Sequence, residues 1–133
     1  MRALPCVVVA LLLGACAGMK PTASTMSAQQ AQAVVQDPIR TDRDRQMDAS
    51  RKPVEFLAFA QVAPGMRILD VSAGAGYTTQ IMALAVGPTG KVWAQSPNPG
   101  AALAKRLSDH PQPNITVAKR PFIDRITGLA LNR

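Results

Sequence analysis

The chain has 133 residues, with 15 Lys or Arg against 8 Asp or Glu, so its formal net charge is +7. A chain of this length holds one hydrophobic core, which excludes two independent domains. Both cysteines lie within the first 16 residues, and there is one histidine. This composition excludes a disulfide scaffold and a metal site built from cysteines or clustered histidines, so we expect no metal site.

The first 15 residues have the architecture of a secretory signal peptide, with a basic start, a short apolar run and small residues at the end. The segment Leu13-Gly14-Ala15-Cys16 resembles a bacterial lipobox, which implies diacylation of Cys16 and anchoring in a membrane. Ala17 resembles an outer-membrane sorting residue. We therefore expect an exported lipoprotein of the cell envelope that faces the periplasm. The alternative is an ordinary signal peptide with an incidental cysteine.

The next segment, residues 16–37, is rich in Ser, Thr, Ala and Gln. This composition is typical of a flexible tether, and we expect it to precede a folded domain at 38–133. A weak helix could form at 29–36, but nothing in that stretch requires a core.

Charges of opposite sign alternate between residues 39 and 52. Alternation of this kind predicts a solvated helix with local ion pairs rather than a nucleic-acid-binding arm. Aromatic residues make up 4% of the chain, so nucleic-acid bases have little to stack on and we expect no nucleic-acid partner. The excess of positive charge fits attraction to an anionic membrane surface better.

From Pro53 onward, apolar runs alternate with Gly- and Pro-containing breaks, which predicts regular helices and strands. Strands separated by helices imply an α/β fold, a Rossmann-like parallel sheet with flanking helices and about three strands. The expected elements are a helix from Pro53, a strand at 66–71, a turn at 72–76, a helix at 77–86, a strand at 91–95, a helix at 101–107 and a strand at 115–118.

Ligands of such a sheet bind beyond the carboxyl ends of the strands. Here the first strand ends near Asp70 and leads into a turn that contains Gly74 and Gly76. A nicotinamide dinucleotide site would require a third glycine where Thr79 stands and an acid where Gln95 stands. Both departures disfavour an NAD-dependent oxidoreductase.

Residues 68–79, Ile-Leu-Asp-Val-Ser-Ala-Gly-Ala-Gly-Tyr-Thr-Thr, resemble the first motif of class I S-adenosylmethionine-dependent methyltransferases. That motif is a hydrophobic strand that ends in an acid and continues into a turn of small residues. The wider segment 38–125 resembles a group of bacterial predicted methyltransferases whose members often carry export signals. The resemblance implies S-adenosylmethionine as the cofactor.

The resemblance places Asp70 near the methionine end of the cofactor, with Gly74 and Gly76 giving the backbone clearance that a bulky ligand needs. Ser72 replaces the first glycine of the usual pattern. Each position also has a purely structural interpretation. Asp70 could cap the following helix, and the glycines could simply satisfy the geometry of the turn.

The resemblance implies further contacts after the turn and after the later strands. Tyr77 and Thr78 open the helix beside the cofactor, and Asp124 follows the third strand on the adenine side. Gln95 occupies the position where most class I enzymes have an acid that binds both ribose hydroxyls. An amide can donate and accept hydrogen bonds, but it lacks the charge of a carboxylate.

We expect the cofactor-binding half of a methyltransferase that transfers a methyl group to an unknown acceptor. After residue 124 no fourth strand is evident, so the domain looks truncated and no acceptor-side or catalytic residue can be named. The alternative is a non-catalytic envelope lipoprotein that keeps the scaffold for binding or interaction. The oligomeric state does not follow from the sequence.

Overall fold

The computed structural model describes residues 25–121. The expected signal peptide, the lipidation of Cys16 and the first part of the tether lie outside the described residues, as does Asp124. None of the helices within 25–121 is long and apolar enough to span a bilayer.

A three-stranded parallel sheet forms the centre of the fold, in the order β1-β2-β3. Strands β1 (Arg67–Val71), β2 (Lys91–Ser96) and β3 (Ile115–Lys119) are connected by helices α4 (Tyr77–Val86) and α5 (Ala101–Asp109). Asp70 of β1 lies beside Ala94 of β2, and Ala94 lies beside Val117 of β3. The expected α/β class and parallel sheet are confirmed, with element ends displaced by one or two residues.

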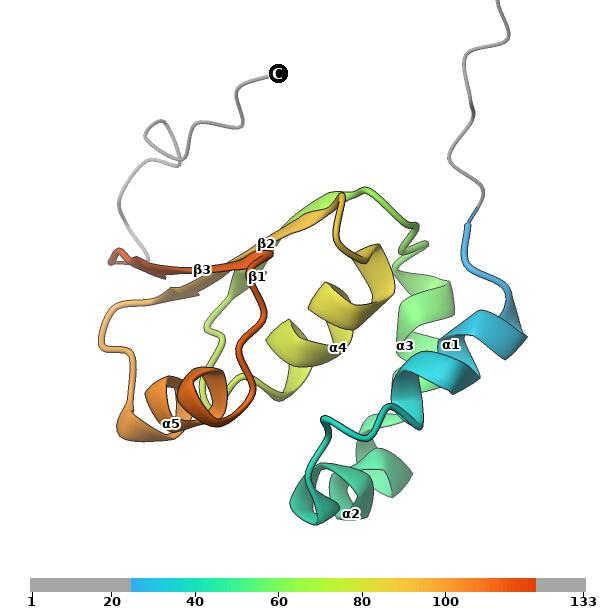
Figure 1. Ribbon diagram of the computed structural model, residues 1–133, viewed down its shortest axis with the longest axis horizontal. Helices are drawn as coiled ribbons and strands as arrows, with labels where there is room; N and C mark the ends of the chain where they lie inside the picture. The colour runs from blue at the N-terminus through green and yellow to red at the C-terminus, as the bar shows by residue number, and fades with distance from the viewer. Residues whose placement is uncertain (1–24, 122–133) are drawn as a thin grey trace, which may run out of the picture.

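The described helices lie on one face of the sheet (Figure 1). Val92 and Ala94 point to this face and are fully buried, because α4 and α5 pack over them. On the opposite face Val71 is 57% exposed. There the guanidinium carbon of Arg67 lies 5.1 Å from the ring centre of Trp93.

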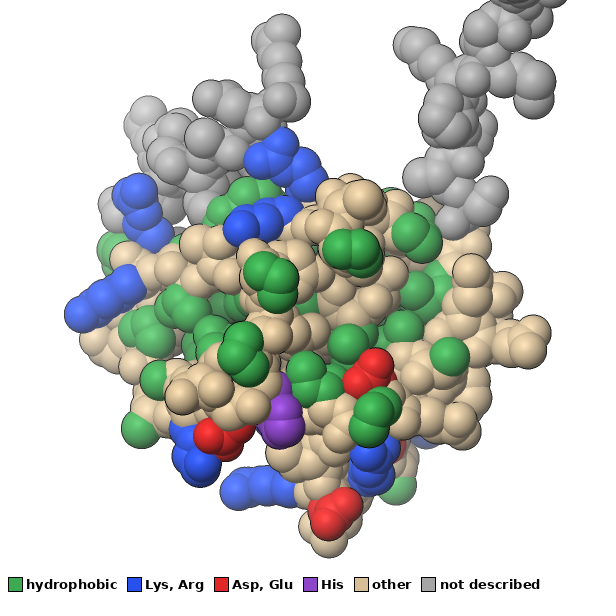
Figure 2. All heavy atoms as spheres, in the orientation of Figure 1, with side chains coloured by type: hydrophobic (Ala, Val, Ile, Leu, Met, Phe, Trp, Pro, Cys, Tyr) green, Lys and Arg blue, Asp and Glu red, His purple; other side chains and the backbone are tan. Residues whose placement is uncertain are grey.

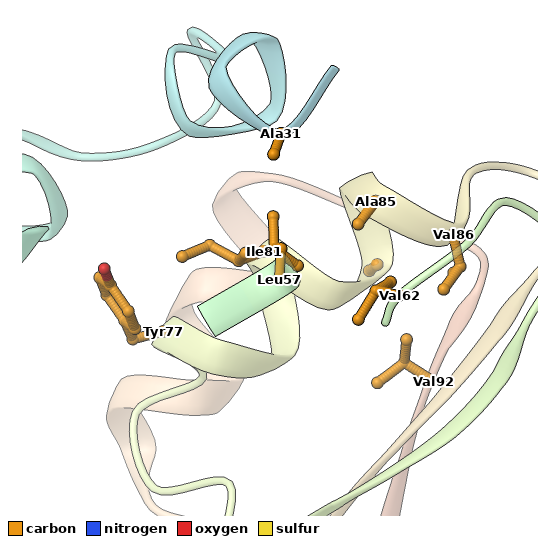
Figure 3. Close-up of a cluster of buried hydrophobic side chains, with 9 residues drawn as sticks. Ala31, Leu57, Val62, Tyr77, Ile81, Ala85, Val86 and Val92 are labelled. Atoms are coloured by element: carbon orange, nitrogen blue, oxygen red, sulfur yellow. The ribbon is translucent and has the colours of Figure 1, made fainter. Parts of the chain in front are cut away.

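Helix α1 (Ala28–Val35) lies within the segment that was expected to be a tether. Ser27 and Gln30 form a capping box at its start, and Ala31 is only 2% exposed. Figure 3 shows Ala31 above Leu57 of helix α3 (Pro53–Phe59) and Ile81 of α4, in one core cluster. The expectation of a tether without a core is therefore wrong for these residues, because small side chains suffice to fill this part of the core.

Helix α2 (Asp42–Arg51) begins with a second capping box, formed by Thr41 and Asp44. The expected solvated helix with local ion pairs is only partly correct. Arg40 pairs locally with Asp48, but Arg40 is 3% exposed and Asp44 is 1% exposed. Charged groups are tolerated at such depth because each one is hydrogen-bonded to a partner of opposite charge.

Candidate functional site

The turn that joins β1 to α4 has three residues with left-handed backbone conformation. Gly74 and Gly76 have φ of +55° and +82°, as expected for a glycine turn. Ser72 has φ of +62°, a conformation that costs a residue with a Cβ about 1–2 kcal/mol. Its backbone N–H donates to the side chain of Gln95 at 3.0 Å, and this bond helps to hold the turn.

The two glycines of the turn have different surroundings. A Cβ on Gly76 would lie 2.7 Å from Leu103 Cδ1 of α5, so Gly76 permits close packing inside the protein. A Cβ on Gly74 would meet only the Ser72 carbonyl oxygen at 3.8 Å. Of the two, Gly74 is therefore the one that lies beside open space.

That space is a cleft of about 680 Å³ between the turn, α2 and α5. Its volume lies within the range of pockets that hold small-molecule ligands. Figure 2 shows basic and acidic side chains close together along the lower edge of the molecule, where α2 and α5 lie. The cleft is lined by the turn residues Ser72 to Ala75, by Tyr77 and Thr78 of α4, by Thr41, Arg43, Met47 and Arg51, and by Ala102, Lys105, Arg106, Asp109 and His110.

The structure brings four of the expected site residues together at this cleft: Ser72, Gly74, Tyr77 and Thr78. Asp70, Gly76 and Gln95 are not among the lining residues. Asp70 and Gln95 are 8% and 5% exposed, and both side chains are engaged by other parts of the protein.

Asp70 lies on the helix-covered face of the sheet, and its Oδ2 accepts a hydrogen bond from the Thr79 hydroxyl at 2.5 Å. Burial raises the pKa of the Asp70 carboxyl, and the Thr79 hydrogen bond partly opposes this effect. The geometry matches a structural role for Asp70, in which β1 is attached to the first turn of α4.

Gln95 connects the ends of all three strands. Its Oε1 accepts from the N–H of Ser72 after β1, and its Nε2 donates to the Arg120 carbonyl oxygen after β3 at 2.6 Å. A carboxylate could accept the first bond, but it has no proton to donate in the second. This double contact explains the presence of an amide where the family resemblance led us to look for an acid.

Tyr77 has a polar environment that the sequence did not predict. Its hydroxyl donates to Asp48 Oδ1 at 2.6 Å, and the guanidinium carbons of Arg40 and Arg51 lie 5.4 and 5.0 Å from its ring centre. Burial, together with the Asp48 hydrogen bond, raises the pKa of Tyr77 to about 12. The phenol is therefore neutral at physiological pH.

The sequence did not single out Arg106, which lines the cleft, or Asp44, which is buried in α2. They form a two-fold hydrogen-bonded ion pair, with both N–O distances at 2.8 Å. Burial alone would raise the pKa of Asp44, but hydrogen bonds from Arg106 and Thr41 outweigh it and lower that pKa to about 2. The one local signal was the Thr41-x-x-Asp44 pattern of a capping box, which carries no information on Arg106.

Two features of the cleft suit S-adenosylmethionine, the cofactor that the sequence resemblance implies. The Gly74 backbone is open to it, and Arg43, Arg51 and Lys105 offer cationic donors to a carboxylate. Within residues 25–121 no group of three or more His, Cys, Asp or Glu side chains is placed to hold a metal ion.

Comparisons with known proteins agree on methyl transfer. The family model described as protein-L-isoaspartate(D-aspartate) O-methyltransferase matches residues 23–100, more than half of the chain. The ubiquinone/menaquinone biosynthesis C-methyltransferase UbiE of Burkholderia vietnamiensis is 51% identical over 37 residues, which are 28% of this chain and 15% of that protein. UbiE proteins of Burkholderia cenocepacia and Burkholderia multivorans match equally well.

The chain thus spans about 15% of the length of these curated relatives. No solved structure matches the chain. On the family match, the chain belongs to the protein-L-isoaspartate(D-aspartate) O-methyltransferase family, within the class I S-adenosylmethionine-dependent methyltransferases.

Proposed function

We propose that this chain binds S-adenosylmethionine in the cleft between the glycine turn, α2 and α5, and supplies the donor half of a methyltransferase site. The observation that carries the proposal is the open position of Gly74. It lies in a left-handed turn at the carboxyl end of β1 and faces a cleft of about 680 Å³. This is the edge of a parallel sheet at which α/β proteins bind their ligands.

In the cleft, the backbone of Ser72 to Ala75 forms a wall that approaches the cofactor closely. Arg43 and Arg51 supply positive charge for the cofactor's carboxylate. When bound, the cofactor's sulfonium supplies a methyl group for transfer to a nucleophile. The matched family transfers methyl groups to oxygen and the UbiE relatives to carbon, as their names state, so the proposal leaves the acceptor open.

The test is a calorimetric titration of the full chain with S-adenosylmethionine, in the wild type and in Gly74→Val. We expect the valine side chain to enter the cleft and to weaken binding at least about tenfold, since overfilled sites resist repacking. Gly87→Val is the matched control, because Gly87 also has positive φ but nothing within 4 Å and lies at the other end of α4. A wild type that gives no heat with millimolar cofactor would refute the proposal.

The hydrogen bonds of Gln95 favour a second candidate, a non-catalytic protein that keeps this scaffold. Both ends of its amide already bond within the protein, at Ser72 and Arg120, where the resemblance implied a ribose contact. Binding of cofactor without methyl transfer to any acceptor in extracts of the source cells would favour this candidate.

We also propose that Cys16 is lipidated and anchors the chain in the cell envelope, on the strength of the Leu13-Gly14-Ala15-Cys16 segment. Such a location favours the second candidate, because S-adenosylmethionine is made in the cytoplasm. Labelling with a fatty-acid analogue tests the anchor. We expect label in the wild type and none in Cys16→Ser, and an unlabelled wild type would contradict the proposal.

A further inference from the structure

One side chain, Arg106 of α5, contacts every other wall of the cleft. Its Nε donates to the Ala75 carbonyl oxygen of the turn at 2.9 Å. Its Nη1 donates to Gln80 Oε1 of α4 at 2.6 Å, and Nη1 and Nη2 each donate to one oxygen of Asp44 in α2. A planar guanidinium fixes the directions of all these bonds together, which a flexible ammonium group cannot do.

The contact with Ala75 sets the orientation of one peptide plane in the turn. In a trans peptide the carbonyl of Ala75 and the N–H of Gly76 point in opposite directions. The first is held by Arg106, and the second donates to the Ala73 carbonyl oxygen at 2.9 Å. Gly76 also packs against α5, where an added Cβ would lie 3.2 Å from Arg106 Cδ. The turn is therefore fixed from both sides.

The contact with Asp44 sets the position of α2, the wall opposite the turn. Asp44 is itself fixed by the N–H and the hydroxyl of Thr41, at 3.0 and 2.8 Å from Oδ2. Asp44 is 1% exposed and the Arg106 side chain 12% exposed. Buried ion pairs often contribute no more stability than apolar side chains of the same size, so net stability does not account for this pair.

We propose that Arg106 is a positioning residue of the cofactor site, which holds the glycine turn and helix α2 at the separation that S-adenosylmethionine requires. The inference rests on the proposed function of the same cleft. Arg106 need not touch the cofactor for this role, since it acts through Ala75 and Asp44.

The test compares Arg106→Lys with Asn114→Ala in the full chain. Lysine keeps the charge but cannot bond to Asp44 through two atoms and to Ala75 at the same time. Asn114 is the control, because its side chain donates to the Ala83 and Gly87 carbonyl oxygens at the far end of α4, away from the cleft. Its loss is expected to lower the melting temperature without changing the turn.

For Arg106→Lys we expect the dissociation constant of S-adenosylmethionine to rise about tenfold. Hydrogen exchange at the Gly76 amide of the ligand-free protein should become faster. For Asn114→Ala we expect a comparable fall in melting temperature, a dissociation constant within about twofold of the wild type, and unchanged exchange at Gly76. Asp44→Asn keeps the arginine and removes the negative charge of the pair. It serves as the second variant if Arg106→Lys does not fold.

The outcomes separate this inference from the proposed function. If the wild type binds and the folded Arg106→Lys or Asp44→Asn variant binds equally well, Arg106 is not a positioning residue and the proposed function stands. If Asn114→Ala, at a comparable fall in melting temperature, loses as much affinity as the two variants do, the role of Arg106 is merely structural and the inference is wrong. A wild type that does not bind refutes the proposed function, and the positioning role with it.

Discussion

The Tyr77 hydroxyl donates a 2.6 Å hydrogen bond to Asp48 and so attaches the first turn of α4 to helix α2. Asp48 also accepts two hydrogen bonds from Arg40, whose side chain is almost fully buried. The Arg40 hydrogen bonds, with a smaller contribution from Tyr77, lower the pKa of Asp48. One ionised carboxylate thus connects α2, which lines the cleft, to the first turn of α4, which follows the glycine turn.

The titration of Tyr77 is directly measurable because it is the only tyrosine in the chain. We expect the ultraviolet tyrosinate signal of the folded protein to rise with a midpoint of about 12, since burial and Asp48 disfavour the phenolate. The raised pKa means that the stability from this group is complete below pH 10 and is lost between pH 10 and about 12. Asp48→Asn should lower the midpoint, whereas the exposed Asp42→Asn should not.

A midpoint near 10 in the folded wild type would show that the Tyr77 hydroxyl is not held by Asp48. Circular dichroism at each pH establishes that the chain is still folded where the midpoint is measured.

Gly76 and Gly74 should differ in their tolerance of a methyl group. Gly76→Ala adds a Cβ at 2.7 Å from Leu103 in a left-handed conformation, so we expect a loss of about 2–4 kcal/mol of unfolding free energy. Gly74→Ala adds the same strain without the clash, and a loss of about 1 kcal/mol is expected. Urea unfolding measures both, and equal losses would contradict the close packing of the turn against α5.

Ser72→Gly should stabilise the protein, which is unusual for a substitution to glycine. Ser72 has φ of +62°, and glycine removes the strain of a Cβ in that conformation while keeping the N–H that bonds to Gln95. We expect a gain of up to about 1 kcal/mol in urea unfolding, because the greater freedom of glycine in the unfolded chain offsets part of the relief.

Ser50→Gly is the control for Ser72→Gly, because Ser50 lies exposed within α2. Glycine at this helical position should lower the free energy of unfolding of the protein by about 0.5–1 kcal/mol. Losses in both variants would show that Ser72 is not strained.

The elements after Pro53 were predictable because their signals are local. Apolar periodicity marks α4, and Gly87 marks its end. Pro64-Gly65 separates α3 from β1. The core position of α1 was not predictable, since Ala31 is too small to identify a buried face on its own.

The connections across the cleft were not predictable for a different reason. Asp44 and Arg106 are 62 positions apart, and each one alone has the pattern of an exposed charge on a polar helix. Gln95 was recognised by its position after the second strand, but its partners, Ser72 and Arg120, become its neighbours only when the sheet forms. Burial of a polar group depends on a partner from another segment, and no local pattern contains that information.

The carboxylate of Asp70, near the end of β1, should lower the free energy of unfolding at neutral pH. Burial raises the pKa of Asp70, so the folded state holds its proton more tightly than the unfolded chain does, and stability falls as pH rises through the folded-state pKa. Asp70→Asn resembles the protonated form and can still accept from Thr79, so we expect it to unfold at higher urea concentration than the wild type at pH 7. The difference should disappear below the ordinary carboxyl pKa of 3.8. An Asp70→Asn variant less stable than the wild type at pH 7 would show that the charge itself stabilises the turn.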